Sequence, residues 1–226
     1  MSVQQTIENS LEILLKQKIK ILGAGRTDTG VHAKQMYAHF DFEEPLDLEN
    51  LIYKLNAFLN KDIGIANVHK VRQDAHARFD AISRQYEYYI TQIKDVYNHD
   101  KKYFFSKKLD FDKIDKAIDI LKNTKNFKSF CRTKSDVTNY NCEIFDFYYE
   151  IKESEIIFRI RANRFLRNMV RSLIGTILDV SLNKLSIEDL TEIIEKSNRI
   201  YAGPSVPAHA LFLSNVEYPK NVFLDE

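Results

Sequence analysis

The chain contains little of the material from which disulfide frameworks, zinc sites and membrane spans are built. It has only two cysteines, Cys131 and Cys142, in 226 residues, so the sequence indicates neither a disulfide framework nor a zinc site. Its longest apolar runs, such as the one around residues 173–178, are far shorter than a membrane-spanning helix requires. The N-terminus has neither the charged start nor the apolar stretch of a signal peptide, so we expect a cytoplasmic protein without a membrane segment.

The motifs of several cofactor-dependent enzyme classes are also absent. The sequence contains no CxxC, no HExxH, no GxGxxG and no P-loop. The histidines lack the spacing of metal ligands; they are His32, His39, His69, His76, His99 and His209. We therefore expect no metal and no small-molecule cofactor, and we expect each histidine to be a surface or structural residue.

The composition that remains is ordinary for a globular protein. Hydrophobic residues make up 44% and charged residues 29% of a chain long enough for one large domain or two small ones. The net charge of +1 gives no support to a nucleic-acid partner. Residues 159–171, however, contain five arginines and no acid, whereas acids gather at 41–47 and 188–195. Charge alone is equally compatible with a basic binding face and with an ordinary solvated one.

Hydrophobic periodicity predicts an alternation of helices and strands. Helices are expected over residues 3–16, 48–59, 111–121, 165–180 and 187–196. Strands are expected over residues 19–22, 35–42, 63–71, 79–90, 142–151, 156–162 and 210–218, with a hairpin turn at 153–154. Asp47 precedes the second helix, and Asp110 or Asp112 is a candidate cap for the third.

The order of these elements predicts an α+β protein made of two similar halves. Residues 76–226 follow the order β-α-β-β-α-α-β, and residues 1–75 match it if their opening strand is missing. Two side-by-side split-βαβ (ferredoxin-like) halves with largely antiparallel sheets account for this pattern. Because residues 64–78 contain no long linker, we expect the halves to share an interface or a continuous sheet.

The most informative segment is LGAGRTDTGVHA at residues 22–33. Asp28 lies there between two threonines, with Arg26 two positions earlier and glycines on both sides. Small residues allow a tight turn and the close approach of a bulky ligand, so the acid is a candidate for chemistry on a large substrate. The alternative is that Asp28 is a turn residue that bonds to its own backbone.

Four ordered stretches resemble the motifs of the TruA-type tRNA pseudouridine synthases. They are LGAGRTDTGVHA at 22–33, ARFDAISRQYEYYI at 77–90, RANRFLRNMVRSLIGTILDV at 161–180 and AGPSVPAHALFL at 202–213. The resemblance implies the pseudouridine synthase fold and an isomerase that converts uridine to pseudouridine in the anticodon stem-loop of tRNA, at positions 38 to 40. It further implies that no cofactor is required and that the protein is a homodimer holding one tRNA across both subunits.

The resemblance assigns roles to particular residues. Asp28 matches the essential acid, as a nucleophile or as a base, and Arg171 matches the basic residue that pairs with it. Tyr86 matches the tyrosine that stacks on the target uracil, although a core role on its strand is the alternative. Leu211 matches a position that packs against the base, although a strand leucine is most often core. Further candidates for tRNA contacts are Arg26, Thr27, His32, Arg78, Arg84, Arg164 and Arg167.

Helical geometry gives the arginines near residue 165 a common face. At 100° per residue, one side of a helix over 165–180 carries Arg164, Arg167, Asn168 and Arg171. The apolar residues fall on the other side; they are Leu166, Met169, Val170, Leu173, Ile174 and Ile177. We expect one face to pack into the core and the other to contact phosphates.

The chain departs from the family pattern at its start. Members begin with a strand and a YDG…GWQ-like segment, whereas residues 2–11 here resemble the family's first helix. Three explanations are open: an artefact at the start of the sequence, another element in the place of the strand, or a second subunit that supplies it. A non-catalytic RNA-binding relative, inactivated by loss of the N-terminal strand, is therefore an alternative function. A phosphate cradle for a nucleotide is a third, disfavoured because no lysine stands in P-loop position.

Overall fold

A computed structural model describes residues 2–133 and 137–224 and has a mixed α+β architecture. The helices are α1 (Val3–Leu15), α2 (Leu48–Phe58), α3 (Phe111–Lys122), α4 (Met169–Ser181) and α5 (Ile187–Lys196). The strands are β1 (Leu22–Gly23), β2 (His32–Ala33), β3 (Ala38–His39), β4 (Ser83–Thr91), β5 (Tyr103–Phe104), β6 (Ile144–Lys152), β7 (Glu155–Ala162) and β8 (Leu211–Glu217). The predicted α+β class with largely antiparallel pairing is confirmed.

The chain forms two compact units. Unit 1 comprises Met1–Arg26, Met36–Ala81 and Tyr218–Glu226, and unit 2 comprises Thr27–Gln35 and Ile82–Glu217. The boundary expected between residues 75 and 76 therefore lies inside a segment of unit 1. The segment 27–35 belongs to unit 2 because β2 pairs in parallel with β8, and the Lys34 N–H donates to the Leu213 carbonyl at 2.8 Å.

Unit 1 contains the α-helices α1 and α2 and the sheet formed by β1 and β3. Both helices begin at side-chain caps: Ser2 Oγ accepts from the Gln5 N–H, and the Asp47 carboxylate accepts from the Asn50 N–H. Strands β1 and β3 pair antiparallel. The buried core of the unit consists of Leu11, Ile19, Ile21, Leu51, Leu55 and Leu59. Both predicted helices of this half are confirmed.

Two strand predictions in unit 1 are wrong: one observed strand is much shorter than predicted, and the other predicted strand is not formed. The strand expected over 35–42 is reduced to the two residues of β3, and residues 63–71 form only an isolated bridge between Val71 and Phe223. Asn56 on α2 explains part of this difference. Its side-chain amide accepts from the Ile65 N–H at 2.7 Å and donates to the Ile65 carbonyl at 2.8 Å, so it occupies the groups that a neighbouring strand would use.

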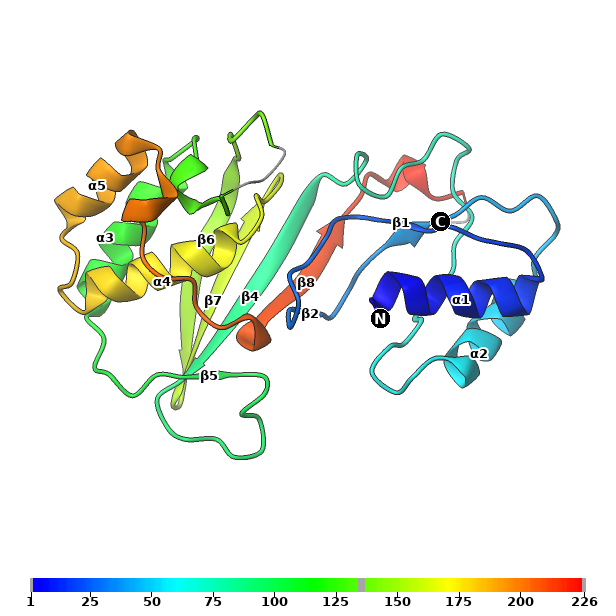
Figure 1. The fold of residues 1–226 in the computed structure, drawn as a ribbon, viewed down its shortest axis with the longest axis horizontal. Helices are drawn as coiled ribbons and strands as arrows, with labels where there is room; N and C mark the ends of the chain where they lie inside the picture. The colour runs from blue at the N-terminus through cyan, green and yellow to red at the C-terminus, as the bar shows by residue number, and fades with distance from the viewer. Residues whose placement is uncertain (1, 134–136, 225–226) are drawn as a thin grey trace. The chain divides into compact units, whose positions relative to one another are not determined.

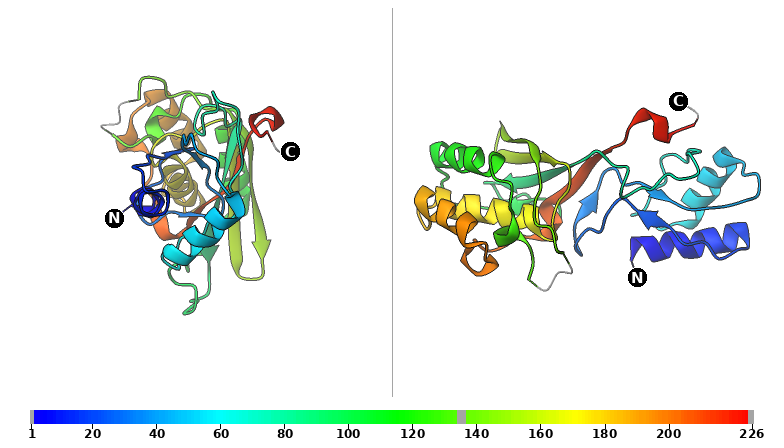
Figure 2. Two further views of the ribbon diagram at one scale, coloured as in Figure 1. Left: turned by 90° about the vertical axis from the view of Figure 1, so that its right-hand side faces the viewer. Right: turned by 90° about the horizontal axis from the view of Figure 1, so that it is seen from above.

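Unit 2 is built on a mixed sheet with the strand order β2-β8-β4-β7-β6, and β5 pairs with β4 off this path. Strands β6 and β7 form the predicted hairpin, whose turn at Glu153 and Ser154 has a positive φ of 54° at its first residue. Figures 1 and 2 show helices α3, α4 and α5 on one face of this sheet. Strand β5 is too short to have been recognised from periodicity.

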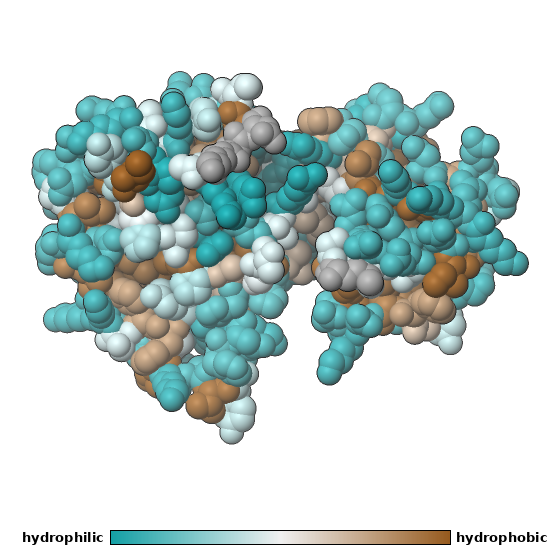
Figure 3. Space-filling view, in the orientation of Figure 1, coloured by the Kyte–Doolittle hydropathy of each residue, from teal (hydrophilic) through white to brown (hydrophobic). Residues whose placement is uncertain are grey.

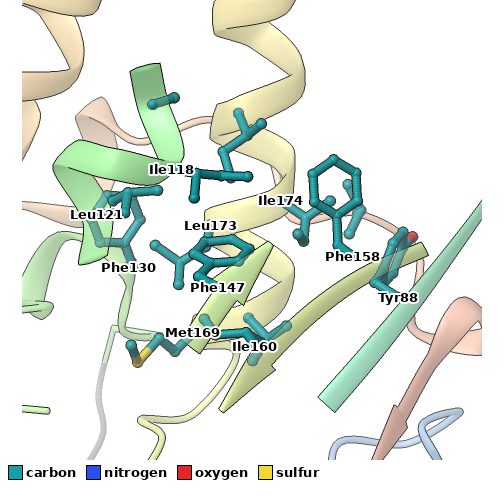
Figure 4. Close-up of a cluster of buried hydrophobic side chains, with 14 of the residues drawn as sticks. Tyr88, Ile118, Leu121, Phe130, Phe147, Phe158, Ile160, Met169, Leu173 and Ile174 are labelled. Atoms are coloured by element: carbon teal, nitrogen blue, oxygen red, sulfur yellow. The ribbon is translucent and has the colours of Figure 1, made fainter. Parts of the chain in front are cut away.

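Hydrophilic side chains dominate the surface visible in Figure 3, whereas the buried side chains are mostly apolar. In unit 2, Phe147 and Phe158 of the sheet face Leu173 and Ile174 of α4 (Figure 4), and all four are at most 2% exposed. Full burial of such a side chain contributes roughly 1.5–3 kcal/mol relative to exposure. The apolar face predicted for this helix is therefore confirmed, and it anchors α4 against the sheet.

Helix α4 begins four residues later than predicted. Asn168, with a left-handed φ of 65°, is its N-cap, and the Arg167 carbonyl accepts from the Arg132 N–H at 3.0 Å outside the helix. Arg164 and Arg167 thus precede the helix, and the predicted arginine face is wrong for these two residues. The left-handed residue turns the chain sharply, and helical periodicity cannot anticipate such a turn. Only Arg171 of the three lies on α4.

Candidate active site

The loop that carries Asp28 is a tight turn closed by its own backbone. The Asp28 carbonyl accepts from the Val31 N–H at 3.1 Å, and Gly30 has a φ of +85°. A side chain at Gly30 would be strained in this conformation and would place Cβ 3.4 Å from Ala208 Cβ. The turn therefore depends on glycine. It uses the Asp28 main chain and leaves the carboxylate available for other partners.

The Asp28 carboxylate is paired with two arginines of the same unit. Oδ2 lies 3.2 Å from Arg171 Nη1, and Oδ1 lies 3.8 Å from Arg167 Nε. The Asp28 and Arg171 side chains are 17% and 21% exposed, whereas Arg167 is 55% exposed. The pair expected with Arg171 is thus present in the structure. Two guanidinium groups fix the orientation of the carboxylate while one of them remains open to solvent.

Arg171 is oriented from its other side by the main chain. Its Nε donates to the Val206 carbonyl at 2.8 Å, and the Val206 N–H donates to the Arg171 carbonyl at 3.2 Å. The guanidinium therefore uses two different nitrogens, one for the chain and one for Asp28. This geometry suits arginine because its donors form a rigid fork.

Val206 belongs to a segment that we call the strap, residues 203–207. Two glycines let the strap lie directly on helix α4. A Cβ at Gly203 would stand 2.8 Å from Thr176 Cα, and a Cβ at Gly175 would stand 1.7 Å from the Pro204 carbonyl oxygen. The Gly203 N–H also donates to Thr176 Oγ1 at 3.0 Å. Backbone contact at this distance is possible only without side chains at both glycines.

Side chains from three elements tie the strap down. Ser205 Oγ accepts from Asn168 Nδ2 at 2.6 Å and from Arg199 Nη2 at 3.1 Å. The Tyr88 hydroxyl donates to the Pro207 carbonyl at 3.0 Å. Burial raises the pKa of Tyr88 well above its usual range, so the hydroxyl remains a donor. The strap is thus a fixed support for Arg171 and, through it, for Asp28.

Sequence reasoning missed these supporting residues. Ser205 and Val206 lie inside the motif at 202–213, in which the resemblance assigns a role only to Leu211. For Asn168, helical periodicity predicts only a place on the arginine face. The positive φ of Asn168 and the pairing of its side chain with Ser205 depend on the tertiary fold. The Gly-Pro sequence of the strap was the one available signal of an unusual backbone path.

Tyr86 lies on β4 near the carboxylate. Its ring meets Phe165 edge-on, with 5.0 Å between centroids. Burial, the largest cause, raises the pKa of Tyr86 to about 12; the Asp28 charge raises it further and the Arg84 charge opposes this. The hydroxyl is therefore neutral near pH 7. Arg84 itself donates to the Asn163 carbonyl at 2.9 Å. Unit 2 thus brings Asp28, Tyr86 and Arg171 together.

Two other candidates lie on opposite faces of the sheet. Leu211 is 5% exposed and pairs in register with Tyr88, so it shares the face of Tyr86 and Tyr88. His32 stacks on Phe212, with 4.6 Å between ring centroids, and Phe212 points to the other face. The structure therefore leaves His32 away from the Asp28 group.

The remaining candidates are divided between the two units. Arg26 and Arg78 are exposed residues of unit 1, whereas Thr27 is exposed beside Asp28 in unit 2. Arg164 is partly buried in the connection between β7 and α4. No group of three or more His, Cys, Asp or Glu side chains within residues 2–133 and 137–224 is arranged to hold a metal ion. In those same ranges, every helix is too short or too polar to cross a membrane.

Comparison with known proteins identifies the family. The sequence model of a family described as tRNA pseudouridine synthase matches residues 117–219. The tRNA pseudouridine synthase A of Parabacteroides distasonis is 47% identical over 224 residues, which cover 99% of this chain and 89% of the relative. The enzymes of that name from Bacteroides fragilis (45%, covering 98% and 89%) and Bacillus cereus (tRNA pseudouridine synthase A 1; 38%, covering 96% and 89%) are similar throughout. The chain belongs to the tRNA pseudouridine synthase A family.

Members of the tRNA pseudouridine synthase A family are isomerases that convert uridine to pseudouridine. The resemblance read from the four motifs is therefore confirmed. The non-catalytic alternative finds no support, because the similarity spans nearly the whole chain and the Asp28 group is assembled. For a synthase of this family, the Asp28, Arg171 and Tyr86 group is the candidate active site.

Proposed function

We propose that this protein isomerises uridine to pseudouridine in tRNA, with Asp28 as the residue that acts on the substrate. The observation that carries the proposal is the Asp28 carboxylate held by Arg171, beside the neutral hydroxyl of Tyr86. Membership in the tRNA pseudouridine synthase A family supports the same reaction.

The reaction rearranges one nucleoside without exchanging a group. The bond from uracil N1 to the ribose breaks, the uracil turns in place, and C5 bonds to the same ribose carbon. C5 loses a proton and N1 gains one, so substrate and product have the same composition. An ionised Asp28 could attack a ribose carbon to form a covalent intermediate, or could remove a proton from the sugar. Tyr86 would stack on the uracil, with its hydroxyl near the departing C5 proton.

We place the target in the anticodon stem-loop, at positions 38 to 40 of tRNA. A uridine in a folded RNA arm must leave its stack before the carboxylate can reach it. Arg167, which is 55% exposed and faces Asp28, is suited to the phosphate of such an extruded nucleotide. Leu211 would pack against the base, and Arg26, Thr27, Arg78, Arg84 and Arg164 would contact the RNA. We further propose a homodimer in the cytoplasm, where the tRNA substrate is present.

We also infer that unit 2 is a split-βαβ half. Apart from the two-residue strands β2 and β5, its element order is β4, α3, β6, β7, α4, α5, β8. The four long strands follow the order β8-β4-β7-β6 in the sheet. In the first βαβ unit, β7 lies between the two strands β4 and β6. In the second, β4 lies between the two strands β7 and β8, so each unit is split by a strand of the other. Unit 1 would be the corresponding half.

Tritium release from unmodified tRNA labelled at C5 of uridine tests the proposed activity. We expect release of C5 tritium with multiple turnovers and without any added cofactor. A protein that binds the tRNA but releases no tritium would contradict the proposal and would favour a non-catalytic RNA-binding relative.

A further inference from the structure

Residues 101–108 of unit 2 read KKYFFSKK, in which four lysines flank three aromatic residues without any acid. Positive charge interleaved with aromatic rings is typical of surfaces that bind single-stranded nucleic acid, because bases stack on rings while cations contact phosphates. The segment contains β5, which pairs in parallel with β4 through Ile90 and Tyr103. Its composition contrasts with the nearly neutral chain, whose net charge is +1.

This basic aromatic segment, 101–108, forms one wall of a cavity of about 520 Å³. The other walls are the C-terminal half of α4 and the strap at Pro204–Pro207. A volume of this size is typical of a small-molecule or nucleotide site. Phe104 is 48% exposed, whereas Tyr103 and Phe105 pack against the hydrophobic core. Phe104 lies in the chain between these two packed residues, and its exposed ring is accessible for stacking with a base.

Two lysines border the same cavity. Lys107 is exposed, and Lys184 is 55% exposed and pairs with Asp179 at 2.8 Å. With one carboxylate against two ammonium groups, the opening is net positive and complements a phosphate. Lysines also occur on edge strands to prevent strand pairing between molecules, and this is the alternative explanation for the segment.

The strap connects the cavity with the candidate active site. Its Val206 lines the cavity and accepts from Arg171, the partner of Asp28, through the main-chain carbonyl. His209, beyond the strap, lies 3.2 Å through Nε2 from the Lys102 carbonyl. The strap and the Arg171 side chain thus link the cavity wall to Asp28.

We propose that this cavity binds a second, unpaired nucleotide of the RNA substrate, distinct from the target uridine. The base stacks on the exposed ring of Phe104, and the phosphate contacts Lys107. The inference rests on the proposed function, because it takes the same RNA as the ligand. It adds a contact that anchors the RNA outside the catalytic group.

Binding of unmodified tRNA by F104A and K107A, compared with the wild type, tests the proposal. Loss of one stacked ring is expected to weaken binding about 10-fold, within the range measured for base stacking. Loss of one phosphate contact should lower the slope of log affinity against log salt by about 0.7–0.9. In the tritium assay, the loss should appear in KM while kcat stays within about twofold. K116A, an exposed lysine on α3 away from the cavity, is the matched control.

Wild-type affinity and an unchanged salt slope in both variants would overturn the second site and would favour edge protection. Equal losses in K116A would overturn it as well, because they would indicate a diffuse charge effect. Binding is measured independently of turnover. A wild-type protein that binds tRNA but releases no tritium would therefore contradict the proposed reaction. The binding affinities of F104A, K107A and K116A would still decide whether the second site exists. K107A changes only an exposed side chain, so its result holds even if F104A folds poorly.

Discussion

At the scale of single residues, the proposed reaction depends on how one carboxylate is held. Asp28 closes its turn with the main chain and presents its side chain to Arg171 and Arg167. Arg171 is in turn fixed by the Val206 carbonyl. Any cationic side chain could supply the positive charge opposite Asp28. To bond to both Val206 and Asp28 at a fixed angle, the side chain needs the two rigidly placed donors of an arginine.

The variant R171K separates charge from orientation. Lysine keeps the positive charge but cannot bond to Val206 and Asp28 in the same geometry. We expect kcat to fall on the order of 100-fold, because misplacement by about 1 Å can cost that much. Steady-state kinetics of tritium release provide the measurement, with R167K as the matched control because Arg167 makes the longer contact. Equal, small effects of both variants would contradict the positioning role of Arg171.

Tyr86 offers a test by pH. In the unfolded chain its phenol titrates near pH 10, and in the folded chain its pKa is about 12. The folded state retains this proton to higher pH than the unfolded chain does. The contribution of Tyr86 to the free energy of unfolding is therefore fully present below pH 10 and is lost as the pH rises toward 12. The difference in tyrosinate absorbance between wild type and Y86F should therefore have a midpoint close to 12. A midpoint near 10 would mean that the ring is not buried as described.

At the scale of elements, the strap and helix α4 act as one support. The contact between them is backbone against backbone, made possible by Gly175 and Gly203. The strap then fixes Arg171 through Val206, while Asn168 and Arg199 hold Ser205. A disturbance of the strap should therefore reach the carboxylate without any change in the reacting groups.

The variant G175A applies such a disturbance. Its Cβ would overlap the Pro204 carbonyl at 1.7 Å, so the strap or the helix must shift. We expect a loss of about 1–3 kcal/mol in the free energy of unfolding, together with a lower kcat. Urea denaturation and the tritium assay measure the two effects. G64A is the control, because a Cβ at Gly64 meets no atom within 4 Å. A fully active, fully stable G175A would contradict the support assigned to the strap.

At the scale of the whole molecule, much of the element order could be predicted from sequence. Helix α5, with its Ser186 and Asp189 capping box, and the β6–β7 hairpin have local signals and were found close to their observed bounds. The tertiary arrangement of the Asp28 loop had no such signal. Residues 27–35 join unit 2 through pairing with β8, which lies almost 180 residues later in the chain.

The candidate site was predictable only where its residues belong to a sequence motif. Motif resemblance indicated Asp28, Tyr86 and Arg171, and the structure brings these three together in unit 2. The roles of Ser205 and Val206 arise from main-chain contacts that no periodicity encodes. The start of α4 at Met169 depends on one left-handed residue, Asn168, so the predicted arginine face was wrong for Arg164 and Arg167.

The charge of the whole chain leads to a prediction about salt. With a net charge of +1, attraction to RNA must come from local basic residues rather than from the overall field. Replacing Arg164 and Arg167 together with glutamine should therefore lower the salt slope of tRNA affinity by roughly 1.4–1.8, as expected for two phosphate contacts. Filter binding over a range of salt concentrations measures this slope. An unchanged slope would mean that neither arginine contacts the RNA.

The central claim is that the Asp28 carboxylate itself acts on the uridine, and D28N tests it most directly. The amide retains the shape of the side chain but can neither attack the ribose nor accept its proton. We predict that tritium release falls by on the order of 100-fold to 10,000-fold while thermal unfolding and tRNA affinity stay close to wild type. D146N, which alters an aspartate paired with Arg161, should keep full activity. A folded D28N protein that releases tritium at the wild-type rate would contradict the account.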